Sequence, residues 1–185
     1  ARPDSKRLLI VGAGTVAASL IEAYRAVFPD IEISIWNRTK AKAEGLGVSV
    51  VDDLAAAVRE ADIISCATMA TDPVIKGEWL RDGQHIDLIG AFKADMREVD
   101  DLAMQRASIF VDSRATTVKH IGELMIPIAS GAISETDVVG DLYDLLQGGG
   151  RTSDDEITLF KNGGGAHLDL MTGQEILKAW KNART

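Results

Sequence analysis

Short, continuous apolar runs alternate with stretches of helical apolar spacing between residues 8 and 111. The runs predict buried parallel strands, and the stretches between them predict connecting helices. The expected strands are 8–11, 31–36, 48–51, 62–67, 85–90 and 108–111. The expected helices are 15–28, 40–45, 54–60 and 99–106. This alternation predicts an α/β fold of the Rossmann type: a doubly wound, mostly parallel sheet with helices on both faces.

The pattern is looser after residue 112. Here we expect helices at 118–128 and 138–146, a strand at 156–160 and a final helix at about 166–180. We therefore predict a dinucleotide-binding domain over residues 1–164, with residues 165–185 forming a separate C-terminal helix.

A glycine-rich loop lies between the first predicted strand and the first helix. Residues 12–17 read Gly-Ala-Gly-Thr-Val-Ala and match the pattern G-x-G-x-x-G/A. Gly12 permits the tight turn, Gly14 lets the backbone approach a pyrophosphate, and the helix start offers unpaired N–H groups. We expect Thr15 and Val16 at that helix start to contact the phosphates as well. The alternative is a purely structural glycine turn.

The end of the second predicted strand bears on the choice of nucleotide. NAD-binding domains usually place Asp or Glu there to bind the ribose hydroxyls. This chain has Asn37, Arg38 and Thr39 instead. A guanidinium cannot accept a hydrogen bond from a ribose hydroxyl but can neutralise a 2′-phosphate. We expect these three residues to bind NADP(H) in preference to NAD(H); the alternative is a solvent-exposed arginine in a turn.

Three further loops follow strands at the edge where doubly wound sheets bind ligands. Their small residues would let a cofactor approach closely, although ordinary tight loops would have the same composition. The candidates for cofactor contact are Ala67, Thr68, Met69, Gly90, Ala91, Phe92, Asn162 and Gly163. The charged stretch at 97–101 is expected to be a solvent-exposed helix start.

Composition excludes several other classes of protein. The chain has 185 residues, 46% of them hydrophobic, and a net charge of −8. That charge argues against a general nucleic-acid binder, and no apolar run reaches the roughly 20 residues of a membrane span. A single cysteine, Cys66, and three scattered histidines give no metal-ligand spacing. We expect a cytoplasmic protein without a metal.

Segments spread through nearly the whole chain resemble one family. They include residues 1–4, 11–14, 36–39, 61–64, 67–68, 77–80, 83–86, 90–91, 97–100, 111–113, 122–124 and 157–161. Their order and spacing resemble the ornithine cyclodeaminase/mu-crystallin family, which also contains a type of alanine dehydrogenase and the cyclic ketimine reductases.

The resemblance implies a Rossmann domain joined to a substrate and dimerisation domain built mostly from the family's N-terminal part. We expect most of that part to be absent here and the C-terminal helix to pack toward it. No catalytic residue can be assigned in this chain, which alone is expected to bind cofactor without turnover. The intact protein is expected to be a homodimer, and this chain alone a monomer or a weak associate.

One departure from the family pattern favours a particular branch. The cyclodeaminases and alanine dehydrogenases are similar in placing an acid just after the fifth strand, where this chain has Phe92. The ketimine reductase branch also lacks the acid. We therefore expect an NADP(H)-dependent reductase of small cyclic imino acids, of the pyrroline- or piperideine-2-carboxylate type. The alternatives are an ornithine cyclodeaminase with bound NAD and a non-enzymatic, NADPH-regulated ligand-binding protein of the mu-crystallin type.

Overall fold

The computed structural model describes residues 1–184, without the side chain of His167. It contains one eight-stranded sheet in which every pairing is parallel. The strands are β1 (Arg7–Val11), β2 (Glu32–Trp36), β3 (Ser49–Val50), β4 (Ile63–Cys66), β5 (His85–Leu88), β6 (Ser108–Val111), β7 (Val138–Gly140) and β8 (Thr158–Lys161). Their order in the sheet is β3-β2-β1-β4-β5-β8-β6-β7, so the chain reverses its direction of winding between β1 and β4. The predicted Rossmann-type fold is confirmed.

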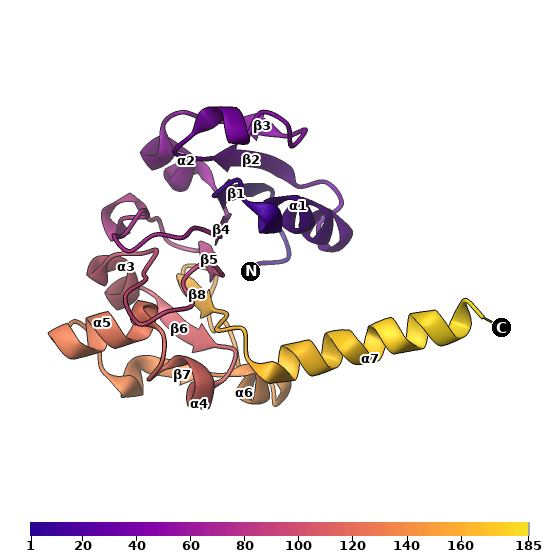
Figure 1. The fold of residues 1–185 in the computed structure, drawn as a ribbon. Coiled ribbons are helices and arrows are strands. Elements are labelled where there is room, and N and C mark those ends of the chain that lie inside the picture. Colours follow the sequence, from indigo (N-terminus) through magenta and orange to yellow (C-terminus); the bar gives the residue numbers. More distant parts are fainter. Residues whose placement is uncertain (185) are drawn as a thin grey trace.

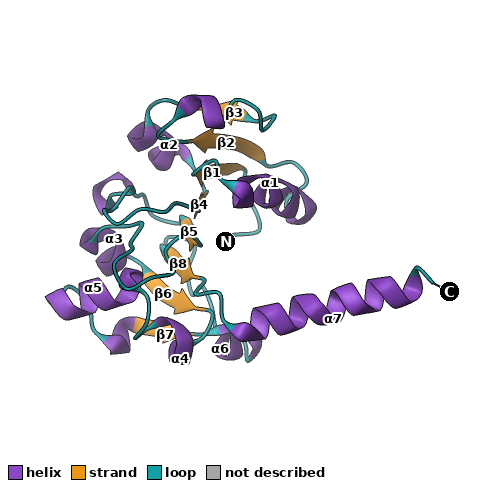
Figure 2. Ribbon diagram, viewed as in Figure 1, coloured by secondary structure: helices purple, strands orange, loops and turns teal. Residues whose placement is uncertain are grey.

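Helices cover both faces of the sheet (Figures 1 and 2). They are α1 (Thr15–Val27), α2 (Leu54–Glu60), α3 (Asp101–Arg106), α4 (Arg114–Thr117), α5 (Gly122–Ser130), α6 (Leu142–Leu146) and α7 (Ala166–Asn182). Short 3-10 turns occupy Lys40–Lys42, Gly77–Trp79 and Glu135–Asp137. The last helix, α7, extends away from the body of the domain (Figure 1). None of the helices described in residues 1–184 combines the length and the apolar character that a membrane crossing requires.

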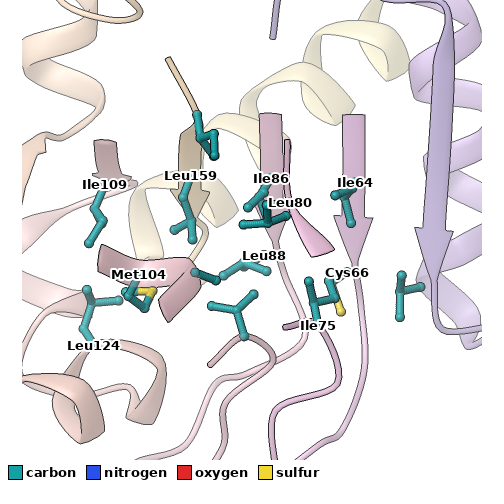
Figure 3. Packing of buried hydrophobic residues seen from close by; sticks show 14 of the residues in the cluster. Ile64, Cys66, Ile75, Leu80, Ile86, Leu88, Met104, Ile109, Leu124 and Leu159 are labelled. Carbon is teal, nitrogen blue, oxygen red and sulfur yellow. The ribbon is translucent and has the colours of Figure 1, made fainter. Parts of the chain in front are cut away.

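The two faces of the sheet are buried in different ways. Leu8 and Ile10 pack with α1, whereas Leu9 and Val11 belong to the larger cluster under α2, α3 and α5. This division follows from the alternation of side chains along a strand. The larger cluster includes Ile64, Ile86, Leu88, Met104, Ile109, Leu124 and Leu159 (Figure 3). The apolar strand runs are therefore explained by burial on both sides.

Three predicted helices are wrong in their extent. The expected helix at 40–45 is reduced to the 3-10 turn Lys40–Lys42. The expected helix at 118–128 is divided, because α4 ends at Thr117 and α5 begins at Gly122. The expected helix at 138–146 begins instead with strand β7, which pairs with β6. Two interactions stop the helix there: the Arg114 guanidinium binds the carbonyl of Val138 at 2.6 Å, and Asp141 caps α6. Strand pairing and the cap override the helical spacing of this segment.

Replacement of Ile64 by alanine tests the importance of the larger cluster. Ile64 is fully buried in the central strand β4, so Ile64→Ala should lower the free energy of unfolding by about 2–5 kcal/mol. Val27, 70% exposed at the end of α1, provides the matched control, and Val27→Ala should change that free energy by less than about 0.5 kcal/mol. Urea denaturation of both variants measures the difference; equal effects would contradict this description of the core.

Candidate functional site

All the residues predicted to contact a cofactor lie where strands β1, β2, β4, β5 and β8 end, or at the start of the helix after β1. Because the strands are parallel, these ends share one edge of the sheet.

The glycine loop (residues 12–14) is held tightly against its neighbours. Gly12 has a φ of +109°, and its N–H donates to the carbonyl of Trp36 at 2.9 Å. A Cβ at this position would lie 2.6 Å from the carbonyl oxygen of Ala67. Only glycine combines this backbone conformation with so close an approach to the β4 loop.

The start of α1 leaves its backbone donors open. In the described chain, the N–H groups of Gly14, Thr15 and Val16 donate to no protein acceptor, and these three residues are exposed. A Cβ built on Gly14 would meet nothing within 4 Å. No acidic residue occupies the first turn of α1. Open space, free N–H groups and the positive end of the helix dipole fit the phosphates of a dinucleotide.

The loop after β2 joins the glycine loop through Asn37. Its Oδ1 accepts from the N–H of Ala13 at 3.1 Å, and its Nδ2 donates to the carbonyl of Thr39 at 2.7 Å. Arg38 is exposed, and no described acidic side chain pairs with its guanidinium. Asn37 therefore holds the loop in place, while Arg38 remains available to an anionic ligand.

The loops after β4 and β5 are joined by Glu98, which its charged neighbours in the sequence predict to be exposed to solvent. Glu98 is fully buried. Its Oε1 accepts from the N–H and the hydroxyl of Thr68 at 2.7 and 2.8 Å. Its Oε2 accepts from the N–H groups of Gly90 and Ala91 at 2.8 and 3.3 Å.

The prediction of a solvent-exposed helix start at 97–101 is therefore wrong for Arg97 and Glu98, whereas Asp100 does cap α3 and is partly exposed, as is Asp101. Arg97 is also buried, and it bonds to the Val99 carbonyl at 3.0 Å and to Asp101 at 2.8 Å. The charges are buried because they have partners: backbone donors for Glu98, and a carbonyl and a carboxylate for Arg97. The only signal for Glu98 in the sequence is that residues 97–100 are among those that resemble the family.

A second carboxylate holds the first in place. Glu123, at the start of α5, accepts from the N–H groups of Glu98 and Val99 at 2.7 and 3.1 Å. Burial, together with the nearby Glu98 carboxylate, raises the pKa of Glu123 to about 7.

The Lys161 ammonium is also buried and donates to the Leu88 carbonyl at 3.1 Å. Burial lowers the pKa of Lys161, whereas Glu98 and Glu123 act in the opposite direction.

The remaining candidates differ in exposure. The N–H of Asn162 donates to the Leu88 carbonyl at 3.0 Å, which fixes the β8 loop beside β5. Gly163 packs against Thr117, Ile121 and Asp112, and no hydrogen bond between described residues joins it to the glycine loop. Met69 and Phe92 are 72% and 52% exposed at the tips of their loops.

Metal ligands and a reactive thiol are not features of the described site. The described side chains include no group of three His, Cys, Asp or Glu residues that could hold a metal ion. Cys66 is free and fully buried, and burial, with Glu98 nearby, raises the pKa of its thiol. That pKa disfavours the thiolate and so makes Cys66 a poor nucleophile.

Comparison with known proteins identifies the family. The model of the ornithine cyclodeaminase/mu-crystallin family matches residues 1–183. This chain belongs to that family. It is 61% identical over 190 residues to the Delta(1)-pyrroline-2-carboxylate reductase of Paracoccus denitrificans. The match covers 96% of this chain but 60% of that relative, so the chain spans little more than half of the relative's length.

Two solved structures are similar to this chain in fold. The Delta(1)-pyrroline-2-carboxylate reductase of Thermococcus litoralis, solved with NADH and L-proline, is 32% identical, with a TM-score of 0.81 over 89% of this chain and 55% of that chain. An archaeal alanine dehydrogenase dimer with bound NAD is 29% identical, with a TM-score of 0.91 over 100% of this chain and 60% of that chain.

The raised pKa of Glu123 predicts a specific pH dependence of stability. A pKa of about 7 in the fold, against an ordinary 4.5, means that the native state binds the proton more tightly. The contribution of Glu123 to the free energy of unfolding is therefore full below pH 4.5 and is lost as the pH rises through 7. Glu123→Gln cannot titrate there. The free energy of unfolding of the Glu123→Gln variant, relative to that of the parent chain, should rise between pH 4.5 and pH 7. The expected rise is on the order of 3 kcal/mol, at 1.36 kcal/mol per pKa unit.

Urea denaturation of both proteins between pH 4.5 and pH 8 measures this difference. The pKa of His85, lowered to about 3 mainly by burial, changes stability in the opposite direction. That change occurs in both proteins and cancels in the comparison. A difference that does not vary with pH would contradict the assignment to Glu123.

Proposed function

We propose that this chain is the cofactor-binding part of an NADP(H)-dependent reductase of small cyclic imino acids, of the pyrroline- or piperideine-2-carboxylate type. The observation that carries the proposal is the free set of N–H donors at the start of α1, beside the unpaired Arg38 at the end of β2. The 61% identity to a Delta(1)-pyrroline-2-carboxylate reductase supports the reaction and the substrate class.

The residues of this chain would bind and orient the cofactor. Gly14, Thr15 and Val16 offer backbone donors to the pyrophosphate. The loops after β4 and β5 flank the other half of the dinucleotide. The bound cofactor supplies the hydride that reduces the C=N carbon of the substrate. Two relatives solved with NADH and NAD support a pyridine nucleotide in this position.

The preference for the 2′-phosphate depends on Arg38. Its guanidinium is exposed and unpaired in the described chain, at the end of the strand where NAD-binding domains place an acid. Nearby Lys40 is paired with Asp52 at 2.8 Å. Arg38 is therefore the residue we assign to the phosphate.

Phe92 supports reduction over cyclodeamination. It follows β5 at the tip of an exposed loop, and its ring lies 5.4 Å from the Lys93 ammonium. A phenyl ring cannot transfer a proton, and it lacks the carboxylate that would form an ion pair with the ammonium group of ornithine.

The C-terminal helix supports the proposed domain organisation. Apolar side chains of α7 are exposed, namely Leu170, Met171, Ile176, Leu177 and Trp180. These residues would be covered if α7 packed on the substrate and dimerisation domain, as we propose for a homodimer of full family length. The single cysteine, free and buried, agrees with the cytoplasmic location that we propose.

Titration with the two nucleotides tests the cofactor. NADPH should bind at least tenfold more tightly than NADH, a difference of about 1.4 kcal/mol, and Arg38→Ala should abolish the difference. Quenching of Trp36, which ends β2, reports binding, and Trp36→Phe assigns the signal. Arg25, exposed at the far end of α1, gives the matched control, because Arg25→Ala should change neither affinity. NADH binding as tightly as NADPH would overturn the role of Arg38.

Turnover is tested on a full-length protein that contains this chain. It should oxidise NADPH when given pyrroline- or piperideine-2-carboxylate, whereas the chain alone should bind NADPH without turnover. Absorbance of NADPH measures both. Three results would contradict the reductase: no oxidation with either imine, ammonia release from ornithine without added reductant, or tight NADPH binding with no turnover. Ammonia release from ornithine would favour a cyclodeaminase, and tight NADPH binding without turnover would favour a non-enzymatic binding protein.

A further inference from the structure

The loops after β4 and β5 are joined to each other mainly by one side chain. Strand pairing between β4 and β5 ends at Cys66 and Leu88, followed by a bond from the N–H of Ile89 to the Cys66 carbonyl. Beyond that point, in the described chain, the only hydrogen bonds linking residues 67–69 to residues 89–91 go through the Glu98 carboxylate. Gly90 also packs directly against the backbone of Thr68, but the hydrogen bonds that hold the two loops together depend on Glu98.

Glu98 is arranged to do this with little freedom. Its side chain is fully buried, and its carbonyl accepts from the N–H groups of Val74 and Ile75 at 2.9 and 3.0 Å. Its own N–H is held by Glu123. Its main-chain groups fix the backbone, and burial together with the bonds to both oxygens restrains the carboxylate.

The two loops belong to one half of the proposed nucleotide site. The glycine loop after β1 receives the pyrophosphate, and the end of β2 lies on the adenosine side. The sheet order places β4 and β5 on the opposite side of β1 from β2. The nicotinamide half must extend in that direction.

We infer that Glu98 is the positioning residue for the nicotinamide half of the dinucleotide, because it sets the spacing of the loops after β4 and β5. The inference rests on the proposed function. Glu98 does not touch the cofactor, since it is buried and its four hydrogen bonds are made to the protein. It uses the N–H groups of Thr68, Gly90 and Ala91, so these three donors are not available to the ring.

The Glu98→Gln variant should weaken the hydrogen bonding of one loop more than that of the other. Glutamine keeps one acceptor oxygen and replaces the other with a donor. An NH2 group facing Gly90 and Ala91 would oppose two N–H donors. Facing Thr68, it would oppose one N–H donor, while the hydroxyl can turn to accept. Glu98→Gln should therefore keep both bonds to the β5 loop and loosen the β4 loop, which retains only the bond to the Thr68 hydroxyl.

The experiment compares NADPH with its adenosine half, adenosine 2′,5′-bisphosphate, on the 185-residue chain. Glu98→Gln should weaken NADPH binding about tenfold and change binding of the bisphosphate less than twofold, measured by calorimetry. Glu98→Asp should also weaken NADPH binding, because the shorter side chain keeps the charge but cannot reach both loops. A purely structural role would weaken both ligands equally.

Asp100 gives a matched control from the same segment. Its carboxylate also accepts from two backbone N–H groups, those of Gly77 and Ala103, but away from the cofactor loops. Asp100→Asn should leave both affinities within twofold. If Glu98→Gln does not fold, Thr68→Val tests the same contact by removing only the hydroxyl bond, and should weaken NADPH binding two- to threefold with the bisphosphate unchanged.

The outcomes separate this inference from the proposed function. If the parent chain binds neither ligand, the proposed function fails and the inference with it. If the parent chain binds NADPH and the Glu98 variants bind it equally well, or lose both ligands equally, the inference is wrong and the proposed function stands.

Discussion

The backbone N–H groups at the carboxyl edge of a parallel sheet must find acceptors, and this constraint organises the site. In this chain some of these N–H groups face solvent, and others bond to a buried side chain. At the start of α1 they stay open and exposed, where a ligand can reach them. In the loops after β4 and β5 they turn inward to the Glu98 carboxylate. One edge of the sheet thus holds a rigid half and a half that is available to phosphate.

A buried carboxylate carries an electrostatic cost that its surroundings must offset. Four hydrogen bonds to Glu98 account for much of it, because charged acceptors make strong bonds. The Lys161 ammonium contributes an opposite charge from β8, on the face of the sheet where the neighbouring strands carry Leu88 and Val111. Among the described residues, the Glu123 carboxylate accepts from two N–H groups; burial and the nearby Glu98 charge raise its pKa, although these bonds and Lys161 act in the opposite direction.

The parts of the structure that depend on nearby residues could be predicted from sequence. The glycine loop and the strands next to it are local patterns, and the structure has them where the pattern puts them. The segment at 138–146 could not be predicted, because its first residues pair with β6 and bind Arg114, 24 residues away in the chain. Glu98 was missed for the same reason, since one of its loops is 30 residues distant. A charge buried by distant donors looks like a surface charge in the sequence.

The loops after β4 and β5 combine a fixed base with variable tips. Gly12 and Gly90 have no space for a larger side chain, as they lie against Ala67 and against Thr68 with Glu98. Met69 and Phe92, a residue or two beyond these contacts, are largely exposed. Substitutions at the tips can therefore accumulate without a loss of folding, and substitutions at the base cannot. In evolutionary terms, this separates positions that are free to vary from positions that the fold constrains.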